Sequence, residues 1–79
     1  MKVEVELFAT LAVYLPAGAS GDSVTLDMPD GTTVAEVVRS LAIPIRLECV
    51  TVVNGRDAPS DHRLADGDVL SLFPPLAGG

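Results

Sequence analysis

Apolar and polar residues alternate along two short stretches of the chain. Over residues 2–7 the odd positions are valine, valine and leucine, and the even positions are lysine and glutamate. A second alternation places Val24, Leu26 and Met28 two residues apart. Apolar residues at a period of two are typical of a strand with one buried face. The two stretches therefore predict two strands, and the simplest pairing is a hairpin between them.

A helical period follows the second strand. Thr33 is an N-cap candidate and Glu36 stands three residues later, which is the spacing of a capping box. The apolar positions i, i+3, i+4 and i+7 are Val34, Val37, Val38 and Leu41. Because β-branched valines are poor helix formers, this helix needs to dock against a sheet. We expect it to end near Ala42, since Pro44 disfavours helical geometry at Ile43.

The apolar segment between the two strands ends at Pro16. We expect a short helical turn there, because its residues are compatible with a helix and proline cannot continue one. Phe8, Leu11 and Leu15 would then cap one end of the core. Residues 17–22 contain two glycines and a serine and predict a loop.

The second half of the chain predicts three further strands. Residues 48–53 are largely apolar and end at the hairpin signal Asn54-Gly55. Residues 56–58 would form a short edge strand, and residues 69–73 the last strand. One helix among these strands can cover one face of a sheet, which predicts an α+β fold. A chain of 79 residues has room for one core, so we expect 1–79 to be a single domain.

The sheet face away from the helix is expected to carry an apolar patch. Val50 and Val52 lie on one face of the third predicted strand, opposite to Cys49, Thr51 and Val53, and Phe73 ends the last strand. Exposed apolar patches on soluble monomers commonly mark protein interfaces. We therefore predict that Val50, Val52 and Phe73 form a partner-binding surface next to the start of the C-terminal segment.

Composition narrows the classes of partner. The chain has a net charge of −6, one tyrosine, two phenylalanines and no tryptophan. Such a chain repels phosphate backbones and anionic lipids and lacks a stacking platform for bases, so we expect no nucleic acid and no membrane partner. The N-terminal residues lack the apolar core of a signal peptide, and no segment is long enough to span a bilayer. A cytoplasmic location is expected.

Few side chains offer chemistry of their own. Cys49 is the only cysteine, and within a predicted strand a cysteine is usually a small buried hydrophobe with a raised pKa. His62 has no second histidine or nearby cysteine as a metal partner. Asp66 and Asp68 fit a turn better than a calcium loop. We therefore predict no metal site on this chain.

The last six residues are the most specific segment of the chain. Two prolines favour an extended backbone, and two terminal glycines make a thin tip that can enter a channel closed to any side chain. At ~3.1 Å per residue the segment would project roughly 18 Å. We predict that this extended tail delivers its terminal carboxylate into the active site of another protein. Its residues are Pro74, Pro75, Leu76, Ala77, Gly78 and Gly79.

Six segments in order along the chain resemble a ubiquitin-like β-grasp protein, and specifically the MoaD/ThiS family of sulfur carriers. They are Val5-Glu6-Leu7-Phe8-Ala9-Thr10-Leu11, the capped helix from Thr33 to Leu41, Val52-Val53-Asn54-Gly55, Asp66-Gly67-Asp68, Phe73-Pro74-Pro75 and Gly78-Gly79. The resemblance covers essentially the whole chain and implies a mixed four- to five-stranded sheet with one main helix packed on one face. The Phe-Pro-Pro sequence resembles the small subunit of molybdopterin synthase more than the carrier of the thiamin pathway.

The resemblance implies that the reacting group is the carboxylate of Gly79. An E1-like adenylyltransferase of the MoeB/ThiF type, holding ATP and magnesium, would convert it to an acyl-adenylate. A sulfur donor would then replace AMP and leave a thiocarboxylate. In molybdopterin biosynthesis the sulfur would pass to a pterin precursor on the large synthase subunit, which is MoaE-like. The chain itself would bind no cofactor, and the catalytic residues would lie on its partners.

Three other functions stay open. A ThiS-like carrier would use the same thiocarboxylate for thiamin or another sulfur pathway. A ubiquitin-like protein modifier would join Gly79 to lysines of other proteins, although its own single lysine, Lys2, nearly rules out self-polymerisation. A non-covalent interaction domain would use only its folded surface.

Overall fold

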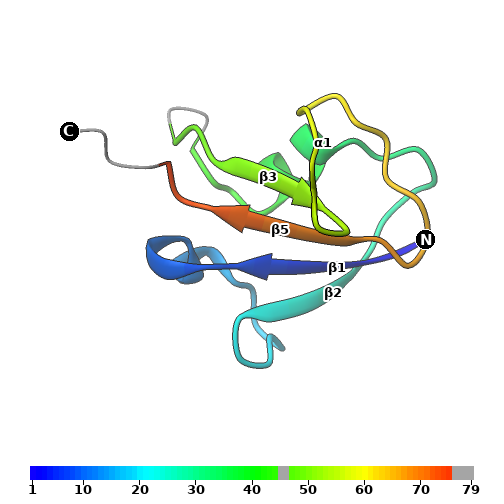
Figure 1. Cartoon of the computed structure of the whole chain (residues 1–79). Coiled ribbons are helices and arrows are strands. Elements are labelled where there is room, and N and C mark those ends of the chain that lie inside the picture. The colour runs from blue at the N-terminus through cyan, green and yellow to red at the C-terminus, as the bar shows by residue number, and fades with distance from the viewer. Residues whose placement is uncertain (45–46, 76–79) are drawn as a thin grey trace.

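The computed structural model describes residues 1–44 and 47–75 of the chain. Its strands form one five-stranded sheet in the order β2-β1-β5-β3-β4, and the expected α+β fold with one main helix is confirmed (Figure 1). The elements in chain order are β1 (Lys2–Leu7), the 3-10 helix η1 (Ala9–Tyr14), β2 (Ser23–Asp27), α1 (Val34–Ser40), β3 (Val50–Val53), β4 (Arg56–Asp57) and β5 (Val69–Phe73).

The two alternating segments form the predicted hairpin. Strands β1 and β2 pair antiparallel, with Val3 opposite Leu26 and Val5 opposite Val24. Residues directly opposite each other share a face, so these four side chains point to the same side of the sheet. On its other edge β1 pairs with β5 in parallel, and Val5 lies opposite Leu70. The first and last strands of the chain are therefore neighbours within the sheet.

Helix α1 begins with the predicted capping box. The Glu36 N–H donates to the Thr33 hydroxyl at 3.3 Å, and the Thr33 N–H donates to the Glu36 carboxylate at 2.9 Å. The helix ends before Ala42, whose φ of 61° is left-handed. Its inward residues Val34 and Val37 are fully buried. No helix among the described residues is long and apolar enough to cross a membrane.

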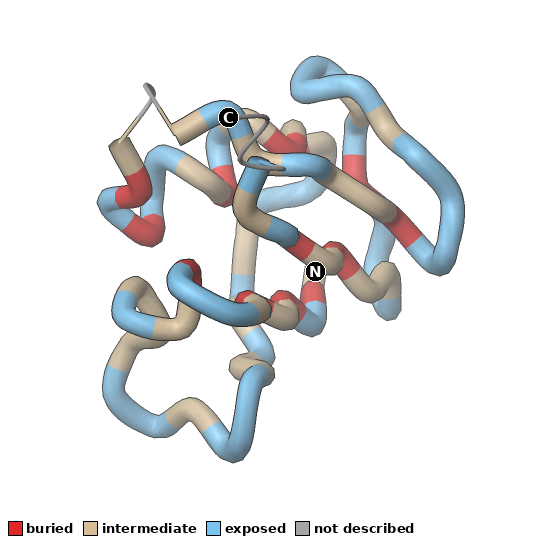
Figure 2. The backbone as a smooth tube through the Cα atoms, turned by 60° about the vertical axis from the view of Figure 1, so that its left-hand side comes forward, coloured by how far each residue is buried: buried red, intermediate tan, exposed pale blue. Residues whose placement is uncertain are grey.

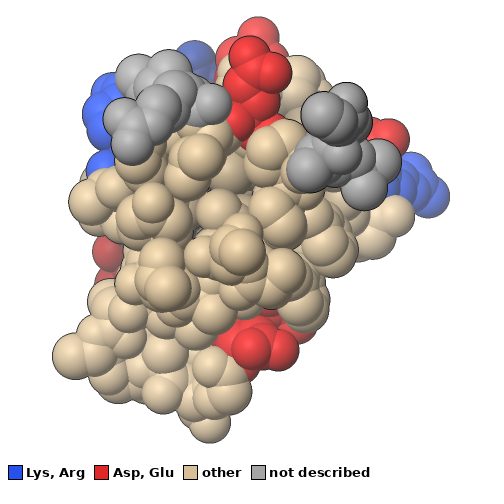
Figure 3. Space-filling model, turned by 90° about the vertical axis from the view of Figure 1, so that its left-hand side faces the viewer, with Lys and Arg blue, Asp and Glu red and all other residues tan. Residues whose placement is uncertain are grey.

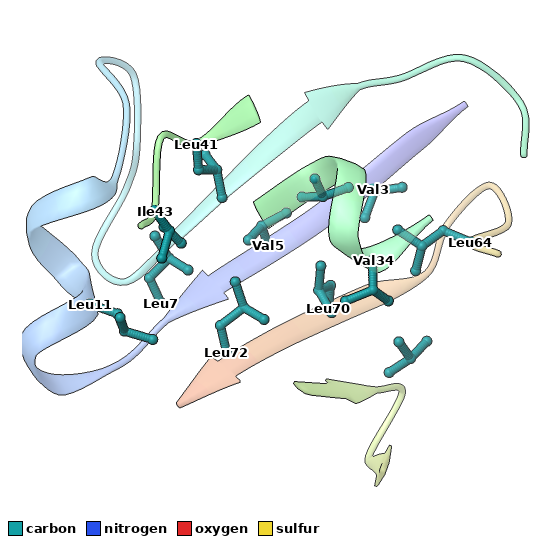
Figure 4. Packing of buried hydrophobic residues seen from close by; sticks show 12 residues of the cluster. Val3, Val5, Leu7, Leu11, Val34, Leu41, Ile43, Leu64, Leu70 and Leu72 are labelled. Atoms are coloured by element: carbon teal, nitrogen blue, oxygen red, sulfur yellow. The ribbon is translucent and has the colours of Figure 1, made fainter. Parts of the chain in front are cut away.

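The core lies between α1 and one face of the sheet (Figure 4). In Figure 2 the buried positions form short bands between half-buried and exposed ones, as alternating strands require. In so small a domain each truncation in this cluster would remove a large part of the stability. The buried apolar residues are Val3, Val5, Leu7, Leu11, Val34, Val37, Leu41, Ile43, Val53, Leu64, Leu70 and Leu72.

The predicted helical turn after β1 is the 3-10 helix η1. Leu11 is buried and Leu15 packs against the core, as expected. Phe8 was wrongly assigned to the core: its ring stacks on Phe73, with centroids 4.8 Å apart and planes at 11°. The alternation explains this placement. The odd positions of β1, up to Leu7, point toward the core, so Phe8, which follows Leu7 in extended backbone, points to the opposite face of the sheet.

Strand β3 is shorter than predicted. It begins at Val50, whereas the sequence suggested Glu48. Val50 lies opposite Phe73, which is the last residue of β5, so residues before Val50 have no strand partner on that side. The Asn54-Gly55 turn has φ values of 51° and 82°, which is the left-handed backbone of a two-residue hairpin.

Candidate functional site

The sheet face away from α1 carries an apolar patch at the end of β5. Phe73 and Val50 lie directly opposite each other and are 38% and 42% exposed. Val52 is half-buried on the same face, opposite Ser71. The fold thus brings together the three side chains predicted for the partner surface, beside the point where the chain leaves the sheet.

Phe8 extends this patch, which the sequence reasoning missed. Its N–H donates to the Leu72 carbonyl at 3.2 Å, and its ring stacks on Phe73. A stacked aromatic pair contributes about 0.5–1.5 kcal/mol beyond the area it buries. This contact restrains the Phe73 ring at the last position of β5. Phe8, Val50, Val52 and Phe73 together are termed the tail-root patch.

The C-terminal segment follows the tail-root patch directly. Pro74 is half-buried and Pro75 is exposed after the end of β5. Strand β5 points away from the end of the sheet at which the N-terminus lies (Figure 1). The remaining predicted tail residues, Leu76, Ala77, Gly78 and Gly79, lie outside the described residues. At no more than ~3.6 Å per residue, four residues keep Gly79 within about 14 Å of Pro75.

The surface around the tail root is largely uncharged. Figure 3 looks onto this end of the molecule, where uncharged residues fill most of the visible surface and charged side chains of both signs lie around it. Within the open sheet face, the Ser71 hydroxyl donates to the Glu6 carboxylate at 2.7 Å. This bond joins β5 to β1 and satisfies the nearest acidic group on the face. A partner would therefore meet a largely uncharged centre with charged edges.

Cys49 lies just before β3 and is half-buried. Its Sγ–H donates to the Leu47 carbonyl at 3.3 Å, and burial raises the pKa of the thiol because the thiolate would be poorly solvated. A thiol kept protonated is a weak nucleophile. With Val38 and Ile43 it lines an apolar groove between α1 and β3. His62, also half-buried, lies in the loop between β4 and β5.

The acidic turn before β5 is satisfied by hydrogen bonds within the fold. The Asp68 carboxylate accepts from the Asn54 side-chain amide at 2.9 Å and from the Ala65 N–H at 2.8 Å. The Asp66 carboxylate accepts from the Lys2 N–H at 2.7 Å. These bonds tie the turn to β1 and to the β3–β4 hairpin. Within residues 1–44 and 47–75, no three His, Cys, Asp or Glu side chains are grouped to hold a metal ion.

Comparison with known proteins identifies relatives of this fold. The model of the ThiS family matches residues 5–79. Small archaeal modifier protein 1 from Haloferax volcanii is 29% identical over 95% of this chain and 98% of that chain, with a TM-score of 0.75. A candidate molybdopterin converting factor subunit 1 from Pyrococcus furiosus is 27% identical over 95% of this chain and 98% of that chain, with a TM-score of 0.73.

A third solved structure contains two proteins. It is a complex of subunits 1 and 2 of the molybdopterin-converting factor from Helicobacter pylori 26695, and the matching chain is 26% identical over 100% of both chains, with a TM-score of 0.60. The mixed five-stranded sheet with one main helix is the ubiquitin-like β-grasp arrangement. The family match covers nearly the whole chain, and the fold agrees with it. The chain therefore belongs to the ThiS family and is a small, ubiquitin-like sulfur-carrier domain of the MoaD/ThiS type.

Proposed function

We propose that this chain carries sulfur as a thiocarboxylate on Gly79. Its membership of a sulfur-carrier family supports this proposal. The observation that carries it is the direct passage from fold to tail: β5 ends in the tail-root patch, and two prolines and two further residues lead to the terminal Gly78-Gly79. Such a chain can dock through its folded surface while only its last carboxylate reacts.

The carboxylate of Gly79 needs activation before it can accept sulfur. An E1-like adenylyltransferase holding ATP and magnesium would form the acyl-adenylate and release pyrophosphate. Hydrosulfide would then attack the carbonyl carbon, the bond to AMP would break, and loss of a proton would leave the thiocarboxylate. If the donor is a persulfide, the first product would be an acyl disulfide, and a donor thiolate would cleave its S–S bond to release the thiocarboxylate and a disulfide. Glycines at the last two positions leave no Cβ to obstruct either approach. The folded residues of this chain would bind the partner and the tail would present the carboxylate, while the partner would supply the catalytic groups.

We further propose molybdopterin biosynthesis as the pathway. One relative is described as a candidate subunit 1 of a molybdopterin converting factor, and another matching chain comes from a complex of subunits 1 and 2 of such a factor. By this likeness, a large synthase subunit of the MoaE type would cover the tail-root patch and receive Gly79. The apolar character of the patch supports such a protein partner.

A protein modifier is the second candidate, because the relative from Haloferax volcanii is described as a modifier protein. The same adenylate could pass Gly79 to a lysine amine and form an isopeptide bond. The family name equally leaves a thiamin-pathway carrier as a third candidate. All three candidate functions begin with adenylation of Gly79, and they differ in the molecule that receives the sulfur or the Gly79 acyl group.

Intact-mass spectrometry after co-expression with the E1-like enzyme and sulfur donor of the same genome separates these functions. Replacement of one carboxylate oxygen by sulfur supports the carrier. Gly79 joined to lysines of other proteins supports the modifier. If neither product forms and deletion of Gly79 is harmless, both the carrier and the modifier are contradicted. That result would favour a non-covalent interaction domain. Loss of the thiocarboxylate on adding the large synthase subunit and a pterin precursor would support the molybdopterin pathway.

A further inference from the structure

Charged residues are absent from two long runs of the sequence. Residues 7–21 and 69–79 contain none of the five Lys and Arg or eleven Asp and Glu residues of the chain. Over the whole chain 20% of the residues are charged, so one in five positions of these runs would be charged by composition alone. The uncharged runs therefore require an explanation that composition does not provide.

Folding brings the described parts of the two runs, residues 7–21 and 69–75, into contact at Phe8, Leu72 and Phe73. The first contains η1, and the second contains β5 and the start of the tail. The hydrogen bond from the Phe8 N–H to the Leu72 carbonyl and the stacking of Phe8 on Phe73 join them. In Figure 1, η1 lies at the end of the sheet from which β5 leads into the tail. The largely uncharged surface in Figure 3 is the outer side of this end.

The 3-10 helix η1 is anchored on both sides and turns one valine outward. Leu11 is buried and Leu15 packs against the core, which attaches both ends of the helix to the fold. The Leu11 N–H donates to the Phe8 carbonyl and the Leu15 N–H to the Ala12 carbonyl, which are hydrogen bonds within the helical turns. Val13 is 80% exposed, more than any other large apolar side chain among the described residues. A single exposed valine is ordinary. Here, however, it lies on an uncharged 3-10 helix whose N-cap residue, Phe8, contacts Leu72 and Phe73 at the end of β5.

The length of the tail determines which protein would cover this surface. Only four residues follow Pro75, so the Gly79 carboxyl stays within about 14 Å of it in any conformation. A protein whose catalytic groups reach that carboxylate must therefore bring its body against this end of the sheet. Burying charged side chains there would carry a desolvation cost, and the two uncharged runs avoid that cost.

We propose that Val13 on η1 is a second docking contact, beside the tail-root patch, for the enzyme that adenylates Gly79. The matching surface of that enzyme is apolar and uncharged. This inference rests on the proposed sulfur-carrier function. Val13 is a specificity residue and takes no part in the chemistry: an enzyme with a charged side chain at this contact would bury that charge without a counter-ion and bind weakly.

The test uses the full-length chain and the activating enzyme of the same genome. Adenylation of wild type, Val13→Asp and Val13→Arg is followed by ATP–pyrophosphate exchange as a function of carrier concentration. We expect the KM for the carrier to rise at least tenfold in both variants and kcat to stay unchanged, since only docking is affected. The thermal midpoint should also stay unchanged, because the Val13 side chain lies in solvent.

Ala65→Asp is the matched control for Val13→Asp. It adds the same negative charge at an exposed position near the other end of the sheet, where the Gly67 N–H donates to the Lys2 carbonyl. Its KM should remain within about twofold of wild type, as expected for a surface change outside the contact. A similar rise in the control would indicate a general charge effect and overturn the inference.

Three other results would overturn the inference, provided that wild type is adenylated. They are an unchanged KM in both Val13 variants, a rise in KM in only one of them, and a fall in kcat with no change in KM. If wild type itself forms neither adenylate nor thiocarboxylate, the proposed function fails and this inference fails with it.

Discussion

At the scale of single residues, Phe73 connects the fold to the candidate function. Its backbone closes the pairing of β5 with Val50, while its ring remains 38% exposed and stacks on Phe8. An aromatic side chain in this position adds little to the buried core and much to the apolar surface. Aromatic residues of this kind often dominate the energy of an interface.

Phe73→Ala should therefore weaken partner binding much more than it lowers stability. We expect at least a tenfold loss of affinity for the activating enzyme or the large subunit, and only a small decrease in the thermal midpoint, from loss of a stacking contact of about 1 kcal/mol. Calorimetric titration and thermal unfolding measure the two effects. Val69→Ala, on the same face of β5, is the control. A large loss of stability with unchanged affinity would refute the role of Phe73.

Cys49 gives a second prediction at this scale. Because burial raises the pKa of its thiol, the thiolate needed to carry sulfur is disfavoured near neutral pH. Cys49→Ala should still form the thiocarboxylate on Gly79 at a rate close to that of wild type, as measured by intact mass. Cys49→Ser tests the polarity of the site separately. If Cys49→Ala folded normally but carried no sulfur, the thiol would have to be part of the transfer.

At the scale of elements, α1 depends on its ends and on its docking face. It has only seven residues, and three of them are valines. So short a helix is marginal by itself. The capping box satisfies N–H groups at its start, and Val34 and Val37 are fully buried beneath it. Cap and packing therefore act together in keeping the core face of the sheet covered.

Thr33→Ala should lower the free energy of unfolding by about 1 kcal/mol, the usual effect of losing an N-cap side chain. Thr33→Ser keeps the hydroxyl and should lose little of this stability. Chemical denaturation of both variants measures the difference. Equal stability of Thr33→Ala and wild type would show that the cap contributes nothing in this fold.

The same capping box predicts a dependence on pH. The Thr33 N–H and then the Thr33 hydroxyl hold the pKa of the Glu36 carboxyl below its ordinary value. A carboxylate with a lowered pKa in the folded state stabilises the protein above the unfolded pKa of about 4.3, and this contribution is lost as the pH falls through the lower folded value. The stability difference between wild type and Glu36→Gln should therefore shrink below about pH 4. Denaturation midpoints measured between neutral and acid pH test this sign.

At the scale of the whole molecule, folding and chemistry occupy separate parts of the chain. The buried apolar residues extend from Val3 to Leu72, whereas the carboxylate proposed to carry sulfur belongs to Gly79. Between Leu72 and Gly79 the chain passes through Phe73, which belongs to the tail-root patch, and two prolines. This division allows a partner to hold the folded part while it works on the end of the tail.

Deletion of Gly79 should leave the thermal midpoint within about 1 °C of wild type, because surface changes away from the core have small effects. It should abolish thiocarboxylate formation. Gly79→Ala keeps a terminal carboxylate but adds a Cβ, and we expect its activation to fall sharply for steric reasons. Intact mass and thermal unfolding are the two measurements. A deletion variant that still acquired sulfur would exclude Gly79 as the carrier.

The sequence by itself determined the features that depend on neighbours along the chain. The period of two in β1, the capping box of α1, the left-handed Asn54-Gly55 turn and the Gly78-Gly79 end each follow from local sterics or periodicity. These signals were also enough to predict the α+β class and to recognise the family resemblance, because both depend on the order of elements along the chain and not on which elements are in contact.

Only the tertiary structure decided which distant residues meet. The parallel pairing of β1 with β5, the stacking of Phe8 on Phe73 and the hydrogen bond from the Phe8 N–H to the Leu72 carbonyl all join opposite ends of the chain. Such contacts depend on the register between strands far apart in sequence, and no local pattern fixes that register. For this reason the sequence predicted the tail, whereas the fold was needed to place Phe8 against Phe73, where the tail begins.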